Sequence, residues 1–371
     1  MKKVFVLSIV FMLIVGLVLT GCQSTPAPAP APTTQAPAPT TPAAPASPIT
    51  SDETVELTFA FHAPPTASLT TAIFEPWATE VEEASNGRIK ITRYPGETLV
   101  KAGDAYDAVA TGLCDIAQVD TEMNPGRFPV LGINTLPFFY PSTEVAGIVS
   151  HEILNKYAVD SELKEVKLLI TAPLHFAQYF GNKPVEKLED FAGLKIRASG
   201  KVEASAIDAL GAIPVEVGTG DMFSALDRGT IDGCFFAYSG ALAFGIKDAT
   251  KYRTELEFLP RVFLVAMNKD AYNQLPADLK EIIDQYSTPE TSYQFAKAHQ
   301  AAQAGPKNAI IGSDKGAGNP PIYVLPDEEK ERWMQVTKVT WDEWVADVTA
   351  KGINGQEIMD EAISLVNQYS Q

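Results

Sequence analysis

The chain has 371 residues, and its 46 acidic against 29 basic side chains give a formal net charge of −17 at pH 7. Such an excess of negative charge repels nucleic acid and anionic lipid headgroups, which argues against either as a binding partner. The length is sufficient for two domains of ordinary size.

The first 22 residues have the pattern of an exported precursor. Two lysines follow Met1, an apolar stretch of 16 residues spans positions 4–19, and the small residue Gly21 precedes Cys22. This pattern resembles the lipobox of bacterial lipoproteins, which implies cleavage after Gly21 and a diacylglycerol on Cys22. The alternative is a single membrane-spanning helix, which needs roughly 20 apolar residues. We therefore predict a signal peptide at 1–21 and a lipid-anchored protein outside the cytoplasm, in a host with one membrane or two.

A proline-rich segment follows the predicted lipidation site. From Gln23 to Thr50 the chain is almost wholly Pro, Ala, Thr, Ser and Gln, with nine prolines and no charged residue. Such a segment buries too little apolar surface to offset the entropy of ordering, and its prolines favour extended conformations. We predict that residues 22–50 form a disordered tether that reaches up to roughly 80 Å, at about 3.1 Å per residue. A glycosylated stalk is the alternative.

The folded part is predicted to begin with a strand, a helix and a second strand. Apolar residues alternate with more polar ones from Val55 to Phe61, which is typical of a half-buried strand ending near His62. A helix follows and ends at Asn86-Gly87. The continuing alternation of strands and helices indicates an α/β fold.

One ten-residue pattern occurs twice in the chain. Tyr106–Asp115 and Phe223–Asp232 share an aromatic residue, an alanine, a branched aliphatic residue, a glycine and an aspartate at identical offsets. Each segment predicts a helix that ends at a glycine with positive φ and leads directly into a strand. Two similar α/β domains would explain the repeat, and chance or generic helix-to-strand chemistry is the alternative. Two such domains facing one another would form a ligand cleft beyond the carboxyl ends of their strands.

Four further segments carry a resemblance to a known family. They are Gly193–Arg197, Ala209–Val215, Phe223–Gly233 and Phe263–Leu275. In this order they resemble the signature of TRAP-transporter solute-binding proteins of the DctP type, and the resemblance covers residues 55 to about 350.

The resemblance implies an architecture and a function. The family has two α/β domains around a central cleft, connected by a long strand and a long helix. Here the domains would comprise residues 55–174 with 261–299 and residues 175–260 with 300–371. In the family they close around a small organic acid and deliver it to membrane subunits that are driven by an ion gradient.

Arg197 is the main candidate for ligand binding. Leu194 and Ile196 alternate with Lys195 and Arg197, so Arg197 is expected on the polar face of a short strand. A guanidinium matches a carboxylate through two parallel hydrogen bonds, which a lysine ammonium cannot reproduce. In the family this arginine makes that contact. The alternative is a solvated strand arginine paired with a nearby acid.

Other contacts are carried over from the family by position. His62 stands where the family commonly places a polar ligand contact. Asp120 follows the predicted strand Ile116–Val119 at a position that often approaches the ligand through water. Phe236 occupies a cleft position that many members fill with Asn or Trp.

The departures from the family pattern suggest the kind of ligand. Several members that bind sugar acids carry a second arginine 20 residues before the first, where this chain has Ala177. The loss of that cation, among aromatic neighbours, favours an acid with an aromatic or branched apolar body. The further side chains that we expect around it are Phe176, Gln178, Phe235 and Tyr238. The alternative for each aromatic residue is ordinary core packing.

Neither a metal centre nor a disulfide framework is indicated. The four histidines lie far apart, and no His-Glu-x-x-His or Cys-x-x-Cys spacing occurs, which argues against a zinc site. A Ca²⁺ or Na⁺ ion that bridges a bound carboxylate is an alternative to binding without any cofactor. Cys114 and Cys234 are expected to be separate buried thiols. Pro289 either starts a helix or kinks one.

The functional hypothesis is therefore a lipid-anchored TRAP receptor for a small organic acid, and not an enzyme. One alternative is a receptor that serves a sensor or an ATP-driven permease. Another is an exported hydrolase or lyase that uses Asp115, Asp120 or Asp232 with His62 as base, although nothing at recognisable spacing assembles a nucleophile, base and oxyanion site.

Overall fold

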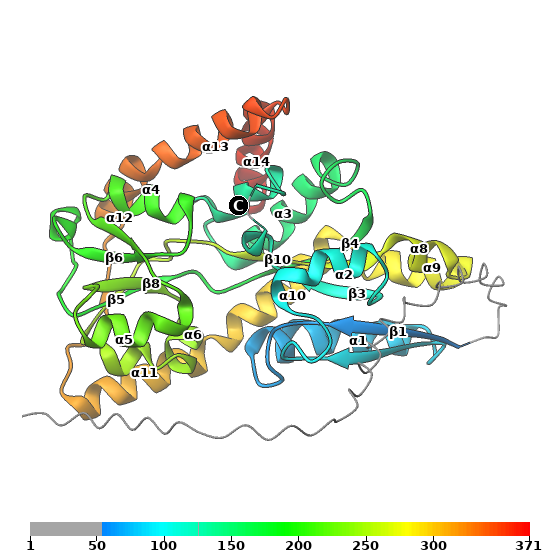
Figure 1. The fold of residues 1–371 in the computed structure, drawn as a ribbon, viewed down its shortest axis with the longest axis horizontal. Coiled ribbons are helices and arrows are strands. Elements are labelled where there is room, and N and C mark those ends of the chain that lie inside the picture. Colours follow the sequence, from blue (N-terminus) through cyan, green and yellow to red (C-terminus); the bar gives the residue numbers. More distant parts are fainter. Residues whose placement is uncertain (1–53, 125) are drawn as a thin grey trace, which may run out of the picture. The chain divides into compact units, whose positions relative to one another are not determined.

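The structure is a computed structural model that describes residues 54–124 and 126–371 (Figure 1). The predicted signal peptide, the predicted lipidation site Cys22 and the predicted tether at 22–50 lie outside the described residues. The described part contains two β-sheets with helices packed on them, which confirms the predicted α/β fold class.

The first sheet has five strands in the order β2-β1-β3-β10-β4. Its strands are β1 (Val55–Ala60), β2 (Ile89–Tyr94), β3 (Ile116–Val119), β4 (Val166–Pro173) and β10 (Val262–Asn268). β1 runs parallel to β2 and β3, whereas β10 is antiparallel to β3 and β4. The strands predicted near Val55 and at Ile116–Val119 are thus confirmed.

The second sheet has six strands in the order β11-β9-β5-β8-β6-β7. Its strands are β5 (Gln178–Gly181), β6 (Lys195–Ala198), β7 (Ile213–Glu216), β8 (Gly233–Phe236), β9 (Tyr252–Glu255) and β11 (Tyr323–Val324). β6 runs parallel to β7 and β8, and β5 is antiparallel to β8 and β9. Three adjacent parallel strands followed by an antiparallel one therefore occur in both sheets.

The helices fall into two groups by the sheet with which they pack. The first sheet is accompanied by the π-helical turn η1 (Thr70–Phe74), α1 (Glu75–Ala84), α2 (Ala105–Ala110), α3 (Thr143–Tyr157), α8 (Lys269–Gln274), α9 (Ala277–Gln285) and α10 (Pro289–Ala302). The second is accompanied by α4 (Lys201–Ala209), α5 (Met222–Asp227), α6 (Tyr238–Ala243), α7 (Ile246–Ala249), α11 (Ala304–Ala317) and α12 (Asp327–Thr337). Short 3₁₀ turns are η2 (Ala102–Asp104), η3 (Thr121–Met123), η4 (Val130–Thr135), η5 (Leu188–Phe191) and η6 (Thr219–Asp221).

The internal repeat predicted from the sequence forms the same local structure twice. α2 leads through Gly112 at φ 76° into β3, and α5 leads through Gly229 at φ 69° into β8. The repeated aspartate also has the same role in each copy. Asp115 accepts a hydrogen bond from the Thr58 backbone N–H at 2.8 Å, and Asp232 accepts one from the Lys195 backbone N–H at 2.9 Å. Each carboxylate thus joins two parallel neighbouring strands.

Two extended segments connect the sheets. Residues 174–177 lead from β4 to β5, and residues 256–261 lead from β9 to β10. The two segments bind each other, because Leu174 donates to the Arg261 carbonyl at 2.7 Å and Phe258 donates to the Ala177 carbonyl at 3.0 Å. This pairing is the long strand connection that the resemblance implies.

A helical connection runs beside the paired segments. α10 packs against α3 and β4 of the first sheet, and α11, which follows after Gln303, packs against α6 of the second sheet (Figure 1). α10 begins at Pro289, and the Thr288 side chain accepts a hydrogen bond from the Thr291 backbone N–H. Pro289 therefore starts a helix and does not kink one, which decides between the two predicted alternatives.

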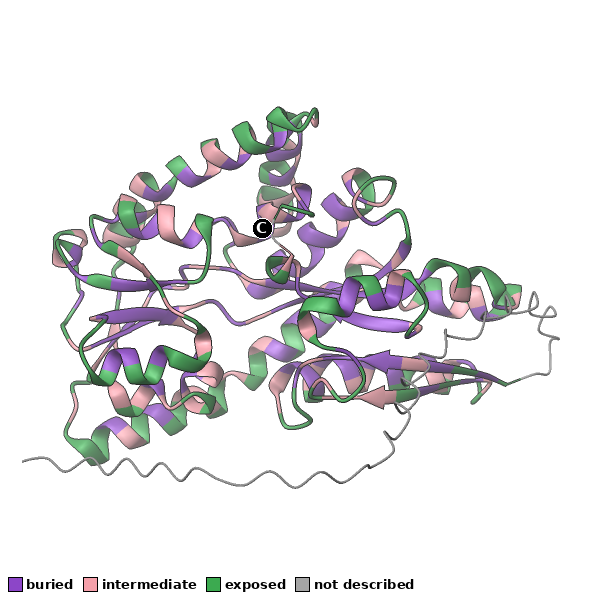
Figure 2. Cartoon of the chain, in the orientation of Figure 1, coloured by how far each residue is buried: buried purple, intermediate pink, exposed green. Residues whose placement is uncertain are grey.

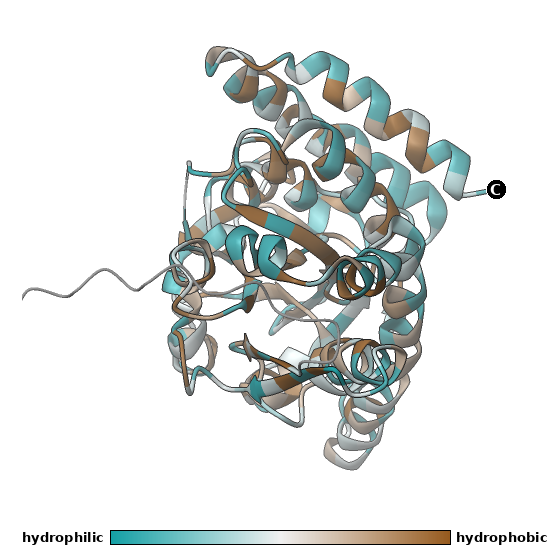
Figure 3. Cartoon of the chain, turned by 90° about the vertical axis from the view of Figure 1, so that its right-hand side faces the viewer, coloured by the Kyte–Doolittle hydropathy of each residue, from teal (hydrophilic) through white to brown (hydrophobic). Residues whose placement is uncertain are grey.

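The C-terminal helices also reach from one sheet to the other. α12 and α13 (Val339–Ala350) pack against α4, whereas α14 (Gly355–Tyr369) packs against α3. Trp344 of α13 and Ile358 of α14 lie in the hydrophobic core beside the first sheet. Hydrophobic and hydrophilic bands alternate along the helix that ends at the C-terminus (Figure 3). The predicted domain boundaries remain a prediction, and they did not anticipate that α14 packs with the first sheet.

The central strands are buried along their whole lengths, and the helices expose one face (Figure 2). Cys114 and Cys234 are both buried and free, which confirms the prediction of two separate thiols. Burial raises the pKa of each thiol to about 12, so both stay protonated at neutral pH.

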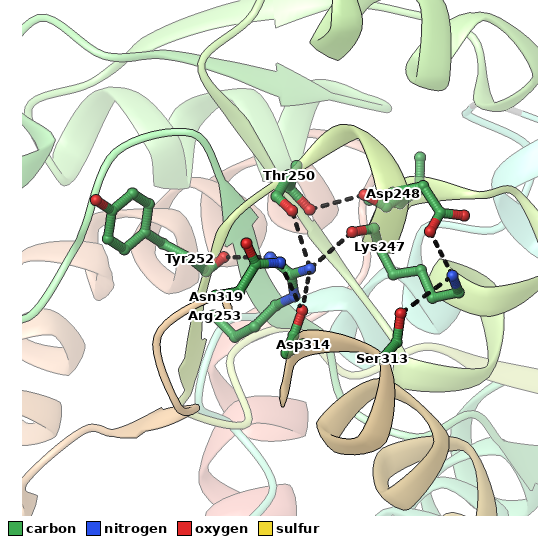
Figure 4. A network of polar contacts seen from close by, with 9 residues as sticks. Lys247, Asp248, Thr250, Tyr252, Arg253, Ser313, Asp314 and Asn319 are labelled. Carbon is green, nitrogen blue, oxygen red and sulfur yellow. Dashed lines mark hydrogen bonds and ion pairs between the residues drawn. The ribbon is translucent and has the colours of Figure 1, made fainter. Parts of the chain in front are cut away.

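A buried ion pair fastens α11 to the second sheet (Figure 4). The Arg253 guanidinium of β9 donates to Asp314 Oδ1 at 3.0 Å and to the backbone carbonyls of Lys247 and Thr250. Asn319 also donates to Asp314 Oδ1, at 3.0 Å. The Arg253 side chain is fully buried and that of Asp314 is 5% exposed. Removing one member of such a pair leaves an uncompensated charge out of water.

We predict that Asp314→Asn lowers the free energy of unfolding by roughly 3–5 kcal/mol, because Arg253 loses its counter-charge. Urea denaturation of the folded protein measures this loss. Glu189→Gln is the matched control, since it removes one partner of an exposed pair with Arg332 and should change little. Equal effects of the two substitutions would contradict this account.

Two fully buried histidines join α10 to neighbouring elements. His151 Nδ1 of α3 lies 2.8 Å from Ser292 Oγ, and His299 Nδ1 lies 3.0 Å from the Pro173 carbonyl. Burial lowers the pKa of each imidazole from 6.5 to about 3. Both rings are therefore neutral in the folded protein at pH values where the unfolded chain is already protonated.

We predict that the protein loses stability between pH 7 and pH 5.5, by about 1 kcal/mol for each of these histidines. The unfolded state binds more protons below its pKa of 6.5, so stability falls as the pH falls. Urea denaturation at both pH values provides the measurement. The double variant His151→Gln/His299→Gln should lose clearly less over this interval, and an unaltered loss would show that other groups are responsible.

Candidate functional site

Arg197 lies near the carboxyl end of β6, which is flanked by β8 and by the edge strand β7 in the second sheet. Ile196 and Ala198 face the hydrophobic core on one side of this strand, and Arg197 faces the other side. Arg197 is only 6% exposed, so it is not the solvated strand arginine that the alternative predicted. A buried guanidinium requires polar partners nearby.

Those partners come from the segments that follow β6 and β7. Arg197 Nε donates to the Val217 carbonyl at 3.0 Å, and a terminal nitrogen donates to Thr219 Oγ1 at 3.3 Å. The other terminal nitrogen lies 3.6 Å from Glu203 Oε2 of α4. Because a guanidinium has five N–H groups, these contacts orient the group and leave donors for a further acceptor.

Glu203 is a buried acid in the first turn of α4. It accepts hydrogen bonds from the Ser199 backbone N–H, at 2.8 Å, and from the Ser199 hydroxyl. Burial raises the pKa of Glu203, whereas the charge of Arg197 lowers it, and the net direction is upward. The alternative from the sequence paired Arg197 with a nearby acid. Glu203 is such an acid, and it is buried.

A second charged cluster surrounds Arg261, just before β10. Its guanidinium donates to Asp120 Oδ2 at 2.6 Å and lies 3.1 Å from Glu122 Oε2. Asp120 Oδ1 also accepts from the Glu122 backbone N–H, so Asp120 caps the turn η3. Burial lowers the pKa of Arg261, but the two carboxylates outweigh this and hold the pKa above its usual value.

The two clusters are close enough for their charges to interact. Arg261 lowers the pKa of Glu203, and Glu203 in turn raises that of Arg261. Burial raises the pKa of Glu122, and both Glu203 and Arg197 also act on it. Two cations and three carboxylates thus share one region of the protein.

His62 lies beside the Arg261 cluster. Gln118 Nε2 lies 3.2 Å from His62 Nε2, so we assign the amide as donor and the ring proton to Nδ1. The ring packs edge-on against Phe263 with centroids 5.2 Å apart. Burial lowers the pKa of His62, Asp120 opposes this shift, and Arg261 adds to it. The structure therefore brings His62 and Asp120 together, as two of the predicted site residues, at an arginine that the sequence analysis missed.

Phe236 shares a sheet face with Arg197. Ile196 pairs with Gly233 between β6 and β8, so Arg197, Cys234 and Phe236 point to the same side. Phe236 is half-buried and packs edge-on against Phe244 with centroids 5.9 Å apart. Among the predicted aromatic ligand contacts, the placement of Phe236 on the same sheet face as Arg197 agrees best with the prediction.

The remaining predicted contacts lie in packed surroundings. Phe235 is on the opposite face from Arg197, 4.4 Å from the Phe258 ring centre, which gives it a core-packing role. Phe176 and Tyr238 are buried in two different hydrophobic clusters. Gln178 is buried too, and its amide binds the backbone of Leu256, Glu257 and Phe176.

The described residues offer neither a membrane span nor a metal centre built from protein side chains. No helix within 54–124 and 126–371 combines the length and apolarity needed to cross a bilayer. In the same part of the chain, no three His, Cys, Asp or Glu side chains are grouped so as to hold a metal ion.

The architecture and the chain's sequence agree with one family. The family model of DctP, "Bacterial extracellular solute-binding protein, family 7", matches residues 59–347. The chain belongs to this family. It is a TRAP-type solute-binding protein, as the resemblance predicted, and a member of a family of binding proteins is a receptor and not an enzyme.

Individual relatives agree with this assignment. The C4-dicarboxylate-binding periplasmic protein DctP of Rhodobacter capsulatus is 25% identical over 73% of this chain and 81% of its own length. A TRAP solute-binding protein from Rhodoferax ferrireducens T118, solved with copurified benzoate, superimposes with a TM-score of 0.76 at 27% identity, covering 85% of this chain and 99% of its own. A marine metagenome TRAP protein specific for aromatic acid ligands, solved with 3-hydroxybenzoate, gives a TM-score of 0.74 at 26% identity over 86% and 100%.

Sequence analysis missed Arg261 and Glu203 for different reasons. Arg261 stands just before the fully buried strand β10, so its charge marked the strand start without indicating any partner. Glu203 is the third residue of α4, a position from which an acid commonly binds the backbone at the helix start. The role of Glu203 was readable from its spacing within the helix, whereas the partners of Arg261 could be found only from the strand order.

Proposed function

We propose that this solute-binding protein is an extracytoplasmic receptor for a small organic acid whose carboxylate binds Arg197. One observation carries the proposal: the Arg197 guanidinium is buried and oriented by Val217 and Thr219, yet these contacts use only some of its donors. A carboxylate is the acceptor that fits the remaining planar fork.

We further propose that the ligand is a monocarboxylic acid with an aromatic body. Two relatives at 26–27% identity were solved with benzoate and 3-hydroxybenzoate. Phe236 lies on the Arg197 face, and its ring can pack edge-on or offset against an aromatic ligand. The absence of a second arginine at Ala177 supports a less polar ligand than a sugar acid.

A C4-dicarboxylate is the second candidate, because the relative from Rhodobacter capsulatus binds that class. A second carboxylate would need a second cation. Arg261 is the nearby candidate, but Asp120 and Glu122 already bind its guanidinium. This pairing favours the monocarboxylate.

Delivery to the TRAP membrane subunits would follow closure around the ligand. We infer two domains, residues 55–174 with 261–299 and residues 175–260 with 300–371, that close and exclude water from the ion pair. Within the second range, α14 packs against α3 and would stay with the first sheet during closure. A ligand shifts such an equilibrium only if it binds the closed state better. Contacts from both domains to one carboxylate would supply that preference.

We predict that Arg197→Ala weakens benzoate binding by roughly 30- to 1000-fold, because it removes charge-assisted hydrogen bonds worth about 2–4 kcal/mol. Isothermal titration calorimetry on folded protein measures the affinity. Arg332→Ala is the matched control, since this exposed arginine pairs with Glu189 and Glu329. Unchanged affinity in folded Arg197→Ala would refute the role of this arginine.

A thermal-shift screen of aromatic, branched-chain and C4-dicarboxylic acids tests the ligand class. A ligand at 100 times its dissociation constant stabilises the folded state by about 2.7 kcal/mol. We expect aromatic monocarboxylates to raise the melting temperature most. A screen in which only uncharged sugars do so would overturn the carboxylate proposal.

We also propose that Cys22 carries the membrane anchor. After expression in a bacterial host, the protein should incorporate labelled palmitate and sediment with membranes, because acyl chains partition into the bilayer. Cys22→Ser should abolish both, whereas Cys114→Ser, which changes a buried thiol of the folded part, should abolish neither. Labelled Cys22→Ser protein would show that lipidation occurs elsewhere.

A further inference from the structure

Arg197 already has an anionic partner within the protein. Glu203 Oε2 lies 3.6 Å from a terminal nitrogen of the guanidinium, and both side chains are at most 10% exposed. Two hydrogen bonds from Ser199 hold the same carboxylate oxygen in this position. Glu203 therefore stands on the side of Arg197 that neither Val217 nor Thr219 occupies.

The surrounding charges do not favour the addition of another anion. With all groups ionised, Arg197 and Arg261 face three carboxylates, so the region carries one excess negative charge. A ligand carboxylate would add a second. Like charges separated by a few ångströms repel strongly where protein replaces water, so one of the acids must change its state or its distance from Arg197.

We propose that Glu203 is an affinity-determining counter-ion, which the ligand carboxylate displaces from Arg197, and that Glu203 takes up a proton as the ligand binds. This inference rests on the proposed binding of a carboxylate at Arg197. One proton from solvent adds to a Glu203 oxygen to give the neutral acid, the ligand stays ionised, and the net charge of the region does not change.

The position of Glu203 makes it the acid that responds. Burial raises its pKa, and Arg197 is the largest influence that opposes this shift. When a ligand carboxylate shares the charge of Arg197, that opposing influence weakens and the pKa of Glu203 rises further. The Ser199 backbone N–H can still donate to the carbonyl oxygen of a neutral Glu203.

Other charged groups near α4 have their own partners. On α13, Glu343 accepts from Ser205, and Asp347 pairs with Lys201. Glu216 of β7 is exposed. Across the site, Arg261 favours the ionised form of Glu203.

Glu122 of η3 is the one other acid of this region with a raised pKa. It lies 3.1 Å from Arg261 and is a third exposed, so it is less confined than Glu203. We therefore assign the proton to Glu203 and treat Glu122 as the alternative acceptor.

Wild-type protein provides the first test, which requires no variant. Benzoate is titrated by calorimetry at pH 7 in phosphate and in Tris, two buffers with very different ionisation enthalpies. We expect the binding enthalpies observed in the two buffers to differ. The difference should correspond to the uptake of up to about one proton per benzoate bound. Benzoate affinity should fall by up to about tenfold per pH unit between pH 6 and pH 8. Benzoate binding with no proton uptake would overturn the inference.

Glu203→Gln provides the second test, because the amide keeps the shape of the side chain and can still accept from Ser199. At pH 8 this variant should bind benzoate about 10- to 100-fold more tightly than wild type, and the buffer dependence should disappear. Glu343→Gln removes the same charge from the neighbouring helix and should leave both properties as in wild type. Weaker or equal binding by folded Glu203→Gln would refute the inference.

Two further outcomes separate this inference from the proposed function. If Glu122→Gln, and not Glu203→Gln, removes the proton uptake, then Glu203 is the wrong acid and the inference fails while Arg197 retains its role. If neither benzoate nor any other carboxylate binds wild type, the proposed function itself fails. The inference stands only if proton uptake is present in wild type and lost in Glu203→Gln.

Discussion

The burial of the Arg197 guanidinium is the constraint on which the candidate site depends. A charge removed from water must be surrounded by acceptors, or it destabilises the fold. Because β6 and β7 are parallel with Arg197 opposite Val215, the residues that follow β7 emerge beside the arginine. The Val217 carbonyl and the Thr219 hydroxyl are supplied in this way, and the first turn of α4 supplies Glu203.

The same arrangement of strand ends places the other charged residues. His62 follows β1 and Asp120 follows β3, and these two strands are parallel neighbours. β10 runs antiparallel to β3 with Leu264 opposite Val119, so the residue that precedes β10 lies at the edge where β3 ends. Arg261 is that residue, and this is why it meets Asp120. Ligands of α/β proteins collect at such edges because the loops beyond the strands are free to carry polar side chains.

The balance of charges connects the fold to the choice of ligand. Both arginines are already compensated by carboxylates of the protein, so the proposed carboxylate ligand would compete with internal partners instead of filling a vacant cationic site. A site of this kind favours a ligand that gains much of its affinity from apolar contacts, which the ring of Phe236 can provide. The paired segments 174–177 and 256–261 join the two sheets, and Arg261 is the last residue of the second segment, so this connection ends in the candidate site.

The sequence by itself determined the local structure and the family. Apolar alternation predicted β1, the repeated segment predicted two helices that end at a glycine and lead into strands, and the ordered motifs identified a DctP-type receptor with Arg197 on a short strand. These features depend on residues close together in the chain, whose spacing is readable without coordinates. Only the tertiary structure decided that Glu203 lies beside Arg197, that Arg261 meets Asp120 in the candidate site, that Phe235 faces the core, and that α14 packs with the first sheet. Each of these depends on which strands are neighbours and which face a strand turns inward, and both are fixed by packing between segments far apart in the chain.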